Sequence, residues 1–327
     1  MKRGVWRRRL ARARECSVAE PAILVDGLTR DFGQMRAVDH VSFEVATGSI
    51  FGFLGPNGAG KTTTINLLLG LLSPTSGTAA VLGFDTGKNP DEVRAHTGAL
   101  LEDDGIYGQL TVEENLEFYG RVWRLPPQEL RTRTQELLNH LGLWDRRTDL
   151  AGTWSRGMKR RLALARALLH RPRVVILYEP TADLDVMAAN EVREDLAGLA
   201  SQTGITIFLT THNMVEAERL CDQIAIIRAG ELIAVGDPDV LRSKASPQVE
   251  VVGRGFTNEA QRRIVSHPGV VGATIEQDRL TIDLAHPMNV APLVEILVGA
   301  GAEIEKVDQP KASLEEAFIA LMQEHAL

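Results

Sequence analysis

The sequence predicts a larger α/β domain with a parallel sheet, followed by a smaller α+β domain. Apolar, β-branched runs at 174–177 and 205–209 are typical of strands buried on both faces of such a sheet. A glycine-rich turn joins a further apolar strand at 49–54 to a helical pattern at 62–72. The composition changes near 238–247, and 327 residues is the length of about two domains.

The larger domain contains two further kinds of pattern. Apolar and polar residues alternate over 23–44 around a turn signal at 31–33, which predicts an antiparallel β subdomain. A helical subdomain is expected within 111–169, where Thr111 and Glu114 form a capping-box signature and Pro126 breaks the first helix. Runs at 224–227 and 232–235 flank Ala229-Gly230 and predict a hairpin.

The smaller domain is expected to be ferredoxin-like. After the composition change the pattern is strand, helix, two strands, helix, strand and helix. Ser313 and Glu316 give a capping box that opens the last helix. We therefore expect an N-terminal extension at 1–20, the α/β domain at 21–240 and the accessory domain at 247–327.

Composition limits the classes of function. The formal net charge of −7 gives no general case for nucleic-acid binding, which usually shows a basic domain. Two cysteines, Cys16 and Cys221, cannot build a disulfide framework and are typical of a reducing compartment. No apolar run approaches the ~18 residues of a membrane helix. If the protein serves a membrane process, another chain must supply the membrane part.

The N-terminus is strongly basic, but no apolar stretch follows it as in a signal peptide. We interpret it as a disordered extension or as the product of a start codon placed too early. An arm that binds lipid headgroups or nucleic acid is the alternative. The basic residues are Lys2, Arg3, Arg7, Arg8, Arg9, Arg12 and Arg14.

One segment matches the phosphate-binding pattern G-x-x-x-x-G-K-[ST] between a predicted strand and a predicted helix. Its glycines let backbone N–H groups approach phosphate oxygens, and the helix N-terminus favours anions. Lys61 can reach the β- and γ-phosphates, and the Thr62 hydroxyl can bind Mg²⁺. The sequence thus predicts a P-loop NTPase with a RecA-like core that binds Mg-ATP. The cofactor-binding residues expected here are Gly55, Pro56, Asn57, Gly58, Ala59, Gly60, Lys61, Thr62 and Thr63.

Further motifs follow in order, and from about residue 23 to 327 the chain resembles the ABC ATPase family. Phe32 matches the aromatic residue that stacks on adenine, although alone it is equally typical of a core position. Ser155-Arg156-Gly157-Met158 resembles the signature loop in the variant found in drug-exporter ATPases of the daunorubicin-resistance type. The resemblance implies that Ser155 and Gly157 contact the γ-phosphate bound by a second subunit, although alone this segment is typical only of a polar helix start.

Three carboxylate and histidine positions complete the resemblance. Glu179 follows the run 174–177 as in a Walker B strand and would be the general base, or else a helix cap. Asp185 matches the loop that couples two sites across the dimer. His212, after Thr210-Thr211, matches the switch histidine that contacts the γ-phosphate, although a lone histidine is more often structural. With Lys61, the residues Glu179 and His212 are the expected catalytic set.

Two positions depart from the family. Glu102 stands where glutamine is usual, and its carboxylate can still contact metal or water, so we assign it with Thr62 to the metal site. Tyr178 stands where the family has the aspartate that helps hold Mg²⁺. A tyrosine with a pKa of about 10 is neutral at physiological pH and is larger than aspartate. We therefore expect ATP binding with slow hydrolysis or none; a local accident at this position is the alternative.

The resemblance implies an ATP-binding subunit that powers an ABC-type exporter of drugs, lipids or glycolipids. Two copies would close on two ATP molecules and drive a separate transmembrane permease, at the cytoplasmic face of the membrane. The first alternative is a non-hydrolysing regulatory or scaffold subunit, which Tyr178 favours. The second is an ATPase that acts on ribosomes or DNA, but such proteins usually carry two cassettes or long coiled-coil insertions. No nucleic-acid partner is expected, and the sequence does not identify the cargo.

Overall fold

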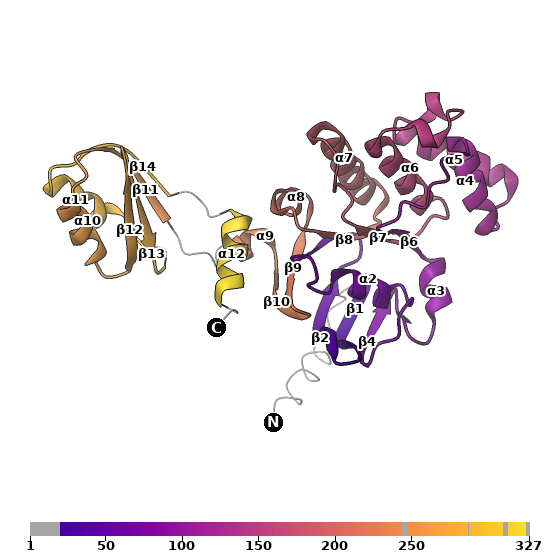
Figure 1. Ribbon diagram of the computed structural model, residues 1–327, viewed down its shortest axis with the longest axis horizontal. Coiled ribbons are helices and arrows are strands. Elements are labelled where there is room, and N and C mark those ends of the chain that lie inside the picture. Colours follow the sequence, from indigo (N-terminus) through magenta and orange to yellow (C-terminus); the bar gives the residue numbers. More distant parts are fainter. Residues whose placement is uncertain (1–19, 243–247, 287, 310–312, 325–327) are drawn as a thin grey trace. The chain divides into compact units, whose positions relative to one another are not determined.

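The computed structural model describes residues 20–242, 248–286, 288–309 and 313–324 (Figure 1). The predicted N-terminal basic extension lies outside the described residues. The chain divides into two compact units, Met1–Val235 and Gly236–Leu327. This division falls slightly before the predicted end of the larger domain at 240, so the short helix α9 (Pro238–Arg242) groups with the second unit.

The centre of the first unit is a six-stranded sheet with the order β10-β9-β3-β8-β7-β6. Strands β9, β3, β8, β7 and β6 run parallel to one another, so their carboxyl ends meet at one edge, where such folds bind ligands. The strand predictions are confirmed, and β3 and β8 are buried along their whole length. Their bounds are β3 Ile50–Leu54, β6 Thr97–Leu100, β7 Val174–Tyr178, β8 Thr206–Thr211, β9 Gln223–Arg228 and β10 Glu231–Gly236.

A second, antiparallel sheet has the order β2-β1-β4-β5 and confirms the predicted β subdomain. Aromatic rings join the two sheets: Phe43 of β2 lies 5.2 Å from Phe51 of β3 and 6.0 Å from Phe208 of β8, between ring centroids. All three rings are buried, so this core fixes both sheets behind the edge that carries the predicted site. The strands are β1 Ile23–Phe32, β2 Met35–Val45, β4 Ser76–Val81 and β5 Phe84–Asp85.

The helices of the first unit fall into two groups (Figure 1). Helices α4 (Val112–Val122), α5 (Pro127–His140) and α6 (Arg156–Leu168) pack on one another and form the predicted helical subdomain. The capping box at α4 is present, since Thr111 Oγ1 accepts from Glu114 N at 3.2 Å and Glu114 Oε2 accepts from Thr111 N at 2.7 Å. The other helices are α2 Lys61–Leu68, α3 Pro90–Ala95, α7 Val186–Thr203 and α8 Met214–Leu220, with 3₁₀ turns at Trp144–Arg146 and Ala151–Thr153.

The second unit contains a four-stranded sheet with the order β12-β13-β11-β14, in which every pair is antiparallel. The elements follow the predicted order of strand, helix, two strands, helix and strand. The last helix, α12 (Leu314–Glu324), packs on α9 and has the predicted capping box at Ser313 and Glu316. The remaining bounds are β11 Gln248–Arg254, α10 Asn258–Val265, β12 Val270–Glu276, β13 Arg279–Leu284, α11 Ala291–Gly299 and β14 Glu303–Asp308.

Within the described ranges of both units, the helices are all too short or too polar to cross a bilayer.

Candidate functional site

The glycine-rich turn between β3 and α2 adopts a conformation that only glycine permits at key positions. Gly60 has a φ of 108°, and a Cβ there would lie 2.5 Å from the carbonyl oxygen of Ala37. A Cβ on Gly55 would lie 2.4 Å from the carbonyl oxygen of Ile227. The loop is therefore held tightly against the neighbouring backbone while α2 begins directly after it, with its N-terminal N–H groups available for an anion.

Lys61 is buried at the start of α2, with only 4% of its side chain exposed. Its Nζ donates to the carbonyl oxygen of Gly55 at 2.6 Å and lies 3.4 Å from Oε1 of Glu179, which is itself 7% exposed. Because a buried charge is costly unless it is paired, each of these groups stabilises the other in this state. An incoming phosphate would compete with Glu179 for the lysine.

Glu179 lies at the carboxyl end of β7 in a strained backbone conformation, with a φ of 45°. Its N–H donates to the carbonyl oxygen of Thr210 on the neighbouring strand β8, at 3.0 Å. Its second carboxylate oxygen, Oε2, lies 2.7 Å from Nδ1 of His212, which directly follows β8. Two adjacent parallel strands and the P-loop thus bring the three predicted catalytic side chains, Lys61, Glu179 and His212, into one cluster.

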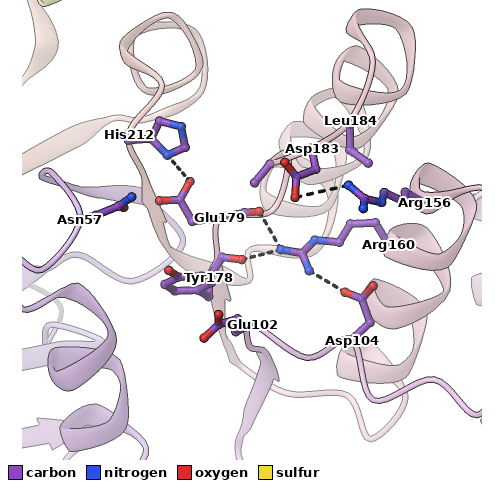
Figure 2. A pocket seen from close by; sticks show the side chains of 11 residues that line it. Asn57, Glu102, Asp104, Arg156, Arg160, Tyr178, Glu179, Asp183, Leu184 and His212 are labelled. Atoms are coloured by element: carbon purple, nitrogen blue, oxygen red, sulfur yellow. Dashed lines mark hydrogen bonds and ion pairs between the residues drawn. The ribbon is translucent and has the colours of Figure 1, made fainter.

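A cavity of about 370 Å³ opens in front of this cluster (Figure 2). Four of the predicted site residues, Asn57, Glu102, Glu179 and His212, line it together with Tyr178. The cavity is polar and open to one side, as a charged ligand would require. Its other lining residues were not predicted as site residues, and they are Asp104, Arg156, Arg160, Ala182, Asp183 and Leu184.

Arg156 belongs to the predicted signature loop at 155–158 and Arg160 follows it on α6, so their basic character was the available signal. Arg156 is exposed and its Nη1 lies 3.5 Å from Oδ2 of Asp183. Arg160 instead is 11% exposed and reaches the backbone around Glu179. Only the fold reveals this difference between two arginines four positions apart.

Tyr178 is the last residue of β7 and is half-buried at the cavity wall. Its side chain packs against the buried apolar core that includes Ile176 and Phe208. The phenol therefore occupies the strand end with an apolar ring and contributes no carboxylate to the cavity. The described residues contain no group of three or more His, Cys, Asp or Glu side chains arranged to hold a metal ion.

Several predicted cofactor residues have local structural roles in this state. The Ser155 hydroxyl caps α6 by accepting from Met158 N at 3.3 Å, and Asp185 caps α7 by accepting from Ala188 N at 2.9 Å. A Cβ on Gly157 would lie 2.9 Å from Cβ of Ala188, so this glycine allows α6 to approach α7 closely. The lining of the cavity includes none of these three predicted residues, although their neighbours Arg156 and Leu184 belong to it.

Three other predicted residues also lie outside the cavity lining. Phe32 ends β1 and is 40% exposed, with the guanidinium of Arg30 4.6 Å from its ring centroid. An exposed ring at this position remains available for stacking and is not a core residue. Thr62 is exposed and Thr63 is half-buried in the first turn of α2, beside Lys61.

A buried carboxyl group behind the site was not predicted. Glu216 of α8 is fully buried, and its Oε1 accepts from the Thr181 hydroxyl at 2.7 Å. Burial raises the pKa of Glu216, although hydrogen bonds from Thr211 and Thr181 oppose the shift. Because Thr181 lies two residues after Glu179, this contact supports the backbone that carries the glutamate. No local sequence pattern marks Glu216, since it lies 35 positions from its partner.

Comparison with known proteins places these features in a family. The profile of the ABC transporter family matches residues 38–182. The bacitracin transport ATP-binding protein BcrA of Bacillus licheniformis is 35% identical over 90% of this chain and 95% of its own length. The daunorubicin resistance ATP-binding protein DrrA3 of Streptomyces coeruleorubidus is 35% identical over 93% of this chain and 96% of its own length.

A solved structure shares the fold of the first unit. CbiO1 from Clostridium perfringens, described as part of the ABC transporter complex cbiONQ, superposes with a TM-score of 0.64 and 26% identity. The alignment covers 68% of this chain and 90% of the other. The predicted resemblance to drug-exporter ATP-binding subunits, and the P-loop fold that it implied, are therefore confirmed.

Proposed function

This chain belongs to the family of ABC transporter ATP-binding proteins, and from that premise we propose that it is the ATP-binding motor subunit of a membrane exporter. The observation that carries the proposal is the cluster of Lys61, Glu179 and His212 beside the P-loop, in which Glu179 and His212 line a polar cavity. The relatives BcrA and DrrA3, named for bacitracin transport and daunorubicin resistance, match almost the whole chain and support export of a drug-like compound.

In this proposal the P-loop N–H groups and Lys61 hold the triphosphate. Lys61 would exchange its 3.4 Å contact with Glu179 for the phosphate oxygens, which frees the carboxylate to accept a proton from the attacking water. His212 contacts Oε2 of Glu179 and is 64% exposed on the cavity side, so it can orient that carboxylate and also face the γ-phosphate.

Mg²⁺ would bind with the nucleotide and neutralise phosphate charge. This ion usually keeps several waters and takes only one or two carboxylates besides phosphate oxygens. The Thr62 hydroxyl and the Glu102 carboxylate, which lines the cavity, provide donors of the right type. The protein would offer fewer ligands to Mg²⁺ than is usual in the family, because Tyr178 brings no carboxylate. The phosphates would therefore supply much of the coordination.

We further propose that two copies close on two ATP molecules and drive a separate transmembrane permease, with the chain peripheral to the cytoplasmic face. Arg156 and Asp183 are both more than 70% exposed at the open side of the cavity, where a second copy would complete it. No nucleic-acid partner is part of this proposal, and the net charge of −7 agrees with that.

Tyr178 supports a second, finer proposal: the chain binds ATP but hydrolyses it slowly. Its ring fills the place of a metal-binding carboxylate and packs into the core behind the cavity. If hydrolysis is absent, the chain would instead be a nucleotide-binding regulatory or scaffold subunit that closes on ATP and stays closed.

The test compares the unaltered chain with Tyr178→Asp. We expect both to bind a fluorescent ATP analogue, and the variant to hydrolyse ATP about 10- to 100-fold faster in the presence of Mg²⁺, because positioning and electrostatics carry most of phosphoryl transfer. Tyr178→Asp with Glu179→Gln is the control for contaminating ATPase and should return to background. Equal, robust turnover by the two chains would refute slow hydrolysis.

A separate measurement addresses the partner. Co-purification of the full chain from its own membranes with a polytopic membrane protein supports the exporter, whereas recovery with RNA or DNA refutes it.

A further inference from the structure

One guanidinium connects three segments around the catalytic glutamate, and none of the motifs above accounts for it. Arg160 lies on the second turn of α6, five residues after the capping Ser155. Its side chain is 11% exposed and contacts Tyr178, Glu179 and Asp104 in the wall of the cavity (Figure 2).

The guanidinium donates to three successive carbonyl oxygens at the end of β7. Nη2 lies 2.6 Å from the oxygen of Tyr178 and 2.6 Å from that of Glu179, and Nε lies 3.2 Å from that of Pro180. Its remaining nitrogen, Nη1, lies 2.5 Å from Oδ1 of Asp104 in the loop that follows β6. A planar fork with five donors is the side chain that can satisfy acceptors in this arrangement.

These contacts act where the backbone is strained. Glu179 has a φ of 45°, a conformation that is unfavourable for a residue with a side chain and persists only if its surroundings enforce it. Arg160 holds the peptide units on both sides of this residue, and Asp104 holds Arg160. The direction of the Glu179 carboxylate therefore depends on α6 and on the loop that contains Glu102.

We propose that Arg160 is a positioning residue that fixes the backbone of Glu179 for hydrolysis and links it to the signature segment of α6. This inference rests on the proposed function, because it concerns the same ATP site. A movement of α6, whose first residues would meet a second copy, would pass to Glu179 through the guanidinium. Asp104 would keep the fork in place without touching the backbone of Glu179.

The test is the turnover of Arg160→Gln beside that of Arg161→Gln. Arg161 is a matched control, since it is adjacent on α6 and 19% exposed, but its guanidinium pairs with Asp195 and Glu191 on α7. Single-turnover hydrolysis, with the chain in excess over labelled ATP, measures even slow chemistry. The same pair of variants is also made in Tyr178→Asp, because Arg160 contacts the carbonyl of residue 178 and not its side chain.

We expect Arg160→Gln to lower the rate of hydrolysis about 100-fold, since a misplacement of about 1 Å can have that effect. ATP affinity should change less than about threefold, since Arg160 does not touch the P-loop segment. Arg161→Gln should leave the rate within a few-fold of its parent. Arg160→Lys should recover only part of the rate, because an ammonium lacks the fork.

A cycle with Glu179→Gln separates positioning from general stability. If Arg160 acts through Glu179, Arg160→Gln lowers turnover little further once Glu179 has been replaced. Any of three results would overturn the inference. The first is an equal rate for Arg160→Gln and its parent, and the second is an equal loss of rate for the Arg160 and Arg161 variants at matched melting temperature. The third is a full further loss of rate when Arg160→Gln is made in the Glu179→Gln background. Failure of the unaltered chain to bind ATP would instead refute the proposed function, so the two failures are distinct.

Discussion

The two walls of the cavity differ in how far their charges are satisfied within one chain. On the P-loop side, Lys61 and Glu179 are 4% and 7% exposed and are paired with each other, and His212 contacts the same carboxylate. On the α6 side, Arg156 and Asp183 are 75% and 79% exposed and lie 3.5 Å apart. An exposed ion pair of this kind contributes only about 0–1 kcal/mol, whereas breaking a buried pair costs several.

This difference indicates how the site is divided between copies of the chain. The P-loop wall has the charge, strain and burial of a site that is already assembled, and its chemistry depends on the fold of one subunit. The α6 wall carries the exposed pair of Arg156 and Asp183 beside the buried Arg160, and the exposed pair suits a surface that a second copy covers. Substitutions at the P-loop wall should therefore act on ATP binding, and substitutions of the exposed pair on association.

The largest effect is expected from Lys61→Ala. The variant removes the charge that grips the phosphates and leaves Glu179 buried without its cation. ATP affinity should fall about 100-fold, as expected for a charge-assisted contact worth up to ~3 kcal/mol. Equilibrium titration with a fluorescent ATP analogue measures this.

Lys159→Ala is the matched control for that titration. Lys159 lies on α6 and its Nζ donates to the carbonyl oxygen of Gly152, so it is a lysine that the P-loop does not use. Its loss should change ATP affinity less than twofold. Unchanged affinity in Lys61→Ala would show that the P-loop wall is not the nucleotide site and would remove the basis of the comparison.

The sequence predicted the P-loop wall better than the α6 wall, for a physical reason. The P-loop, Glu179 and His212 follow buried parallel strands, and such strands bring their carboxyl ends to one edge. The function of Arg160 depends on tertiary packing with Asp104, 56 positions away, and with the end of β7, 18 to 20 positions away.

Local pattern alone does not separate two roles at two positions. Ser155 was assigned to the γ-phosphate of a second subunit and Asp185 to the loop that couples the two sites. Both assignments stay predictions, whereas the structure gives both residues a capping role. An N-cap needs only a short polar side chain before a helix, so the same residue type is typical of either role. The elements themselves were predictable because their buried runs and capping boxes are local.

An intermediate effect is expected from Arg156→Ala, which tests the α6 wall. The melting temperature and the ATP affinity of the dilute monomer should stay close to those of the unaltered chain, because the pair with Asp183 is exposed. ATP-induced dimerisation, measured by sedimentation velocity, should weaken about tenfold, the usual scale for a contact of ~1.4 kcal/mol.

Arg121→Ala is a control for the loss of an exposed arginine, since this residue of α4 is 75% exposed and its ion pair with Glu117 lies outside the cavity lining. Its dimerisation should match that of the unaltered chain. If Arg156→Ala dimerises normally but loses ATP affinity as a monomer, Arg156 acts in ATP binding and not in association, which contradicts the proposed difference between the two walls.

The smallest effect is expected from Glu216→Gln, behind the P-loop wall. Burial raises the pKa of Glu216 above its ordinary value of 4.5, so the folded state binds this proton more tightly than the unfolded chain does. Its contribution to stability is therefore fully present below about pH 4.5 and is lost as the pH rises through the raised pKa. Above the raised pKa the folded protein keeps a buried carboxylate at a cost, and an amide removes that charge.

The free energy of unfolding of the variant should accordingly be slightly higher at pH 8, by less than about 1 kcal/mol. The gain is small because hydroxyls such as that of Thr181 can accept from an amide as well as donate to one. The advantage should disappear as the pH falls towards 4.5. Thermal unfolding across this range, beside the control Glu194→Gln at an exposed position of α7, measures it. A variant that is less stable at pH 8 would mean that the ionised Glu216 supports the Thr181 backbone, and the paired charges of the P-loop wall would then include a second carboxylate.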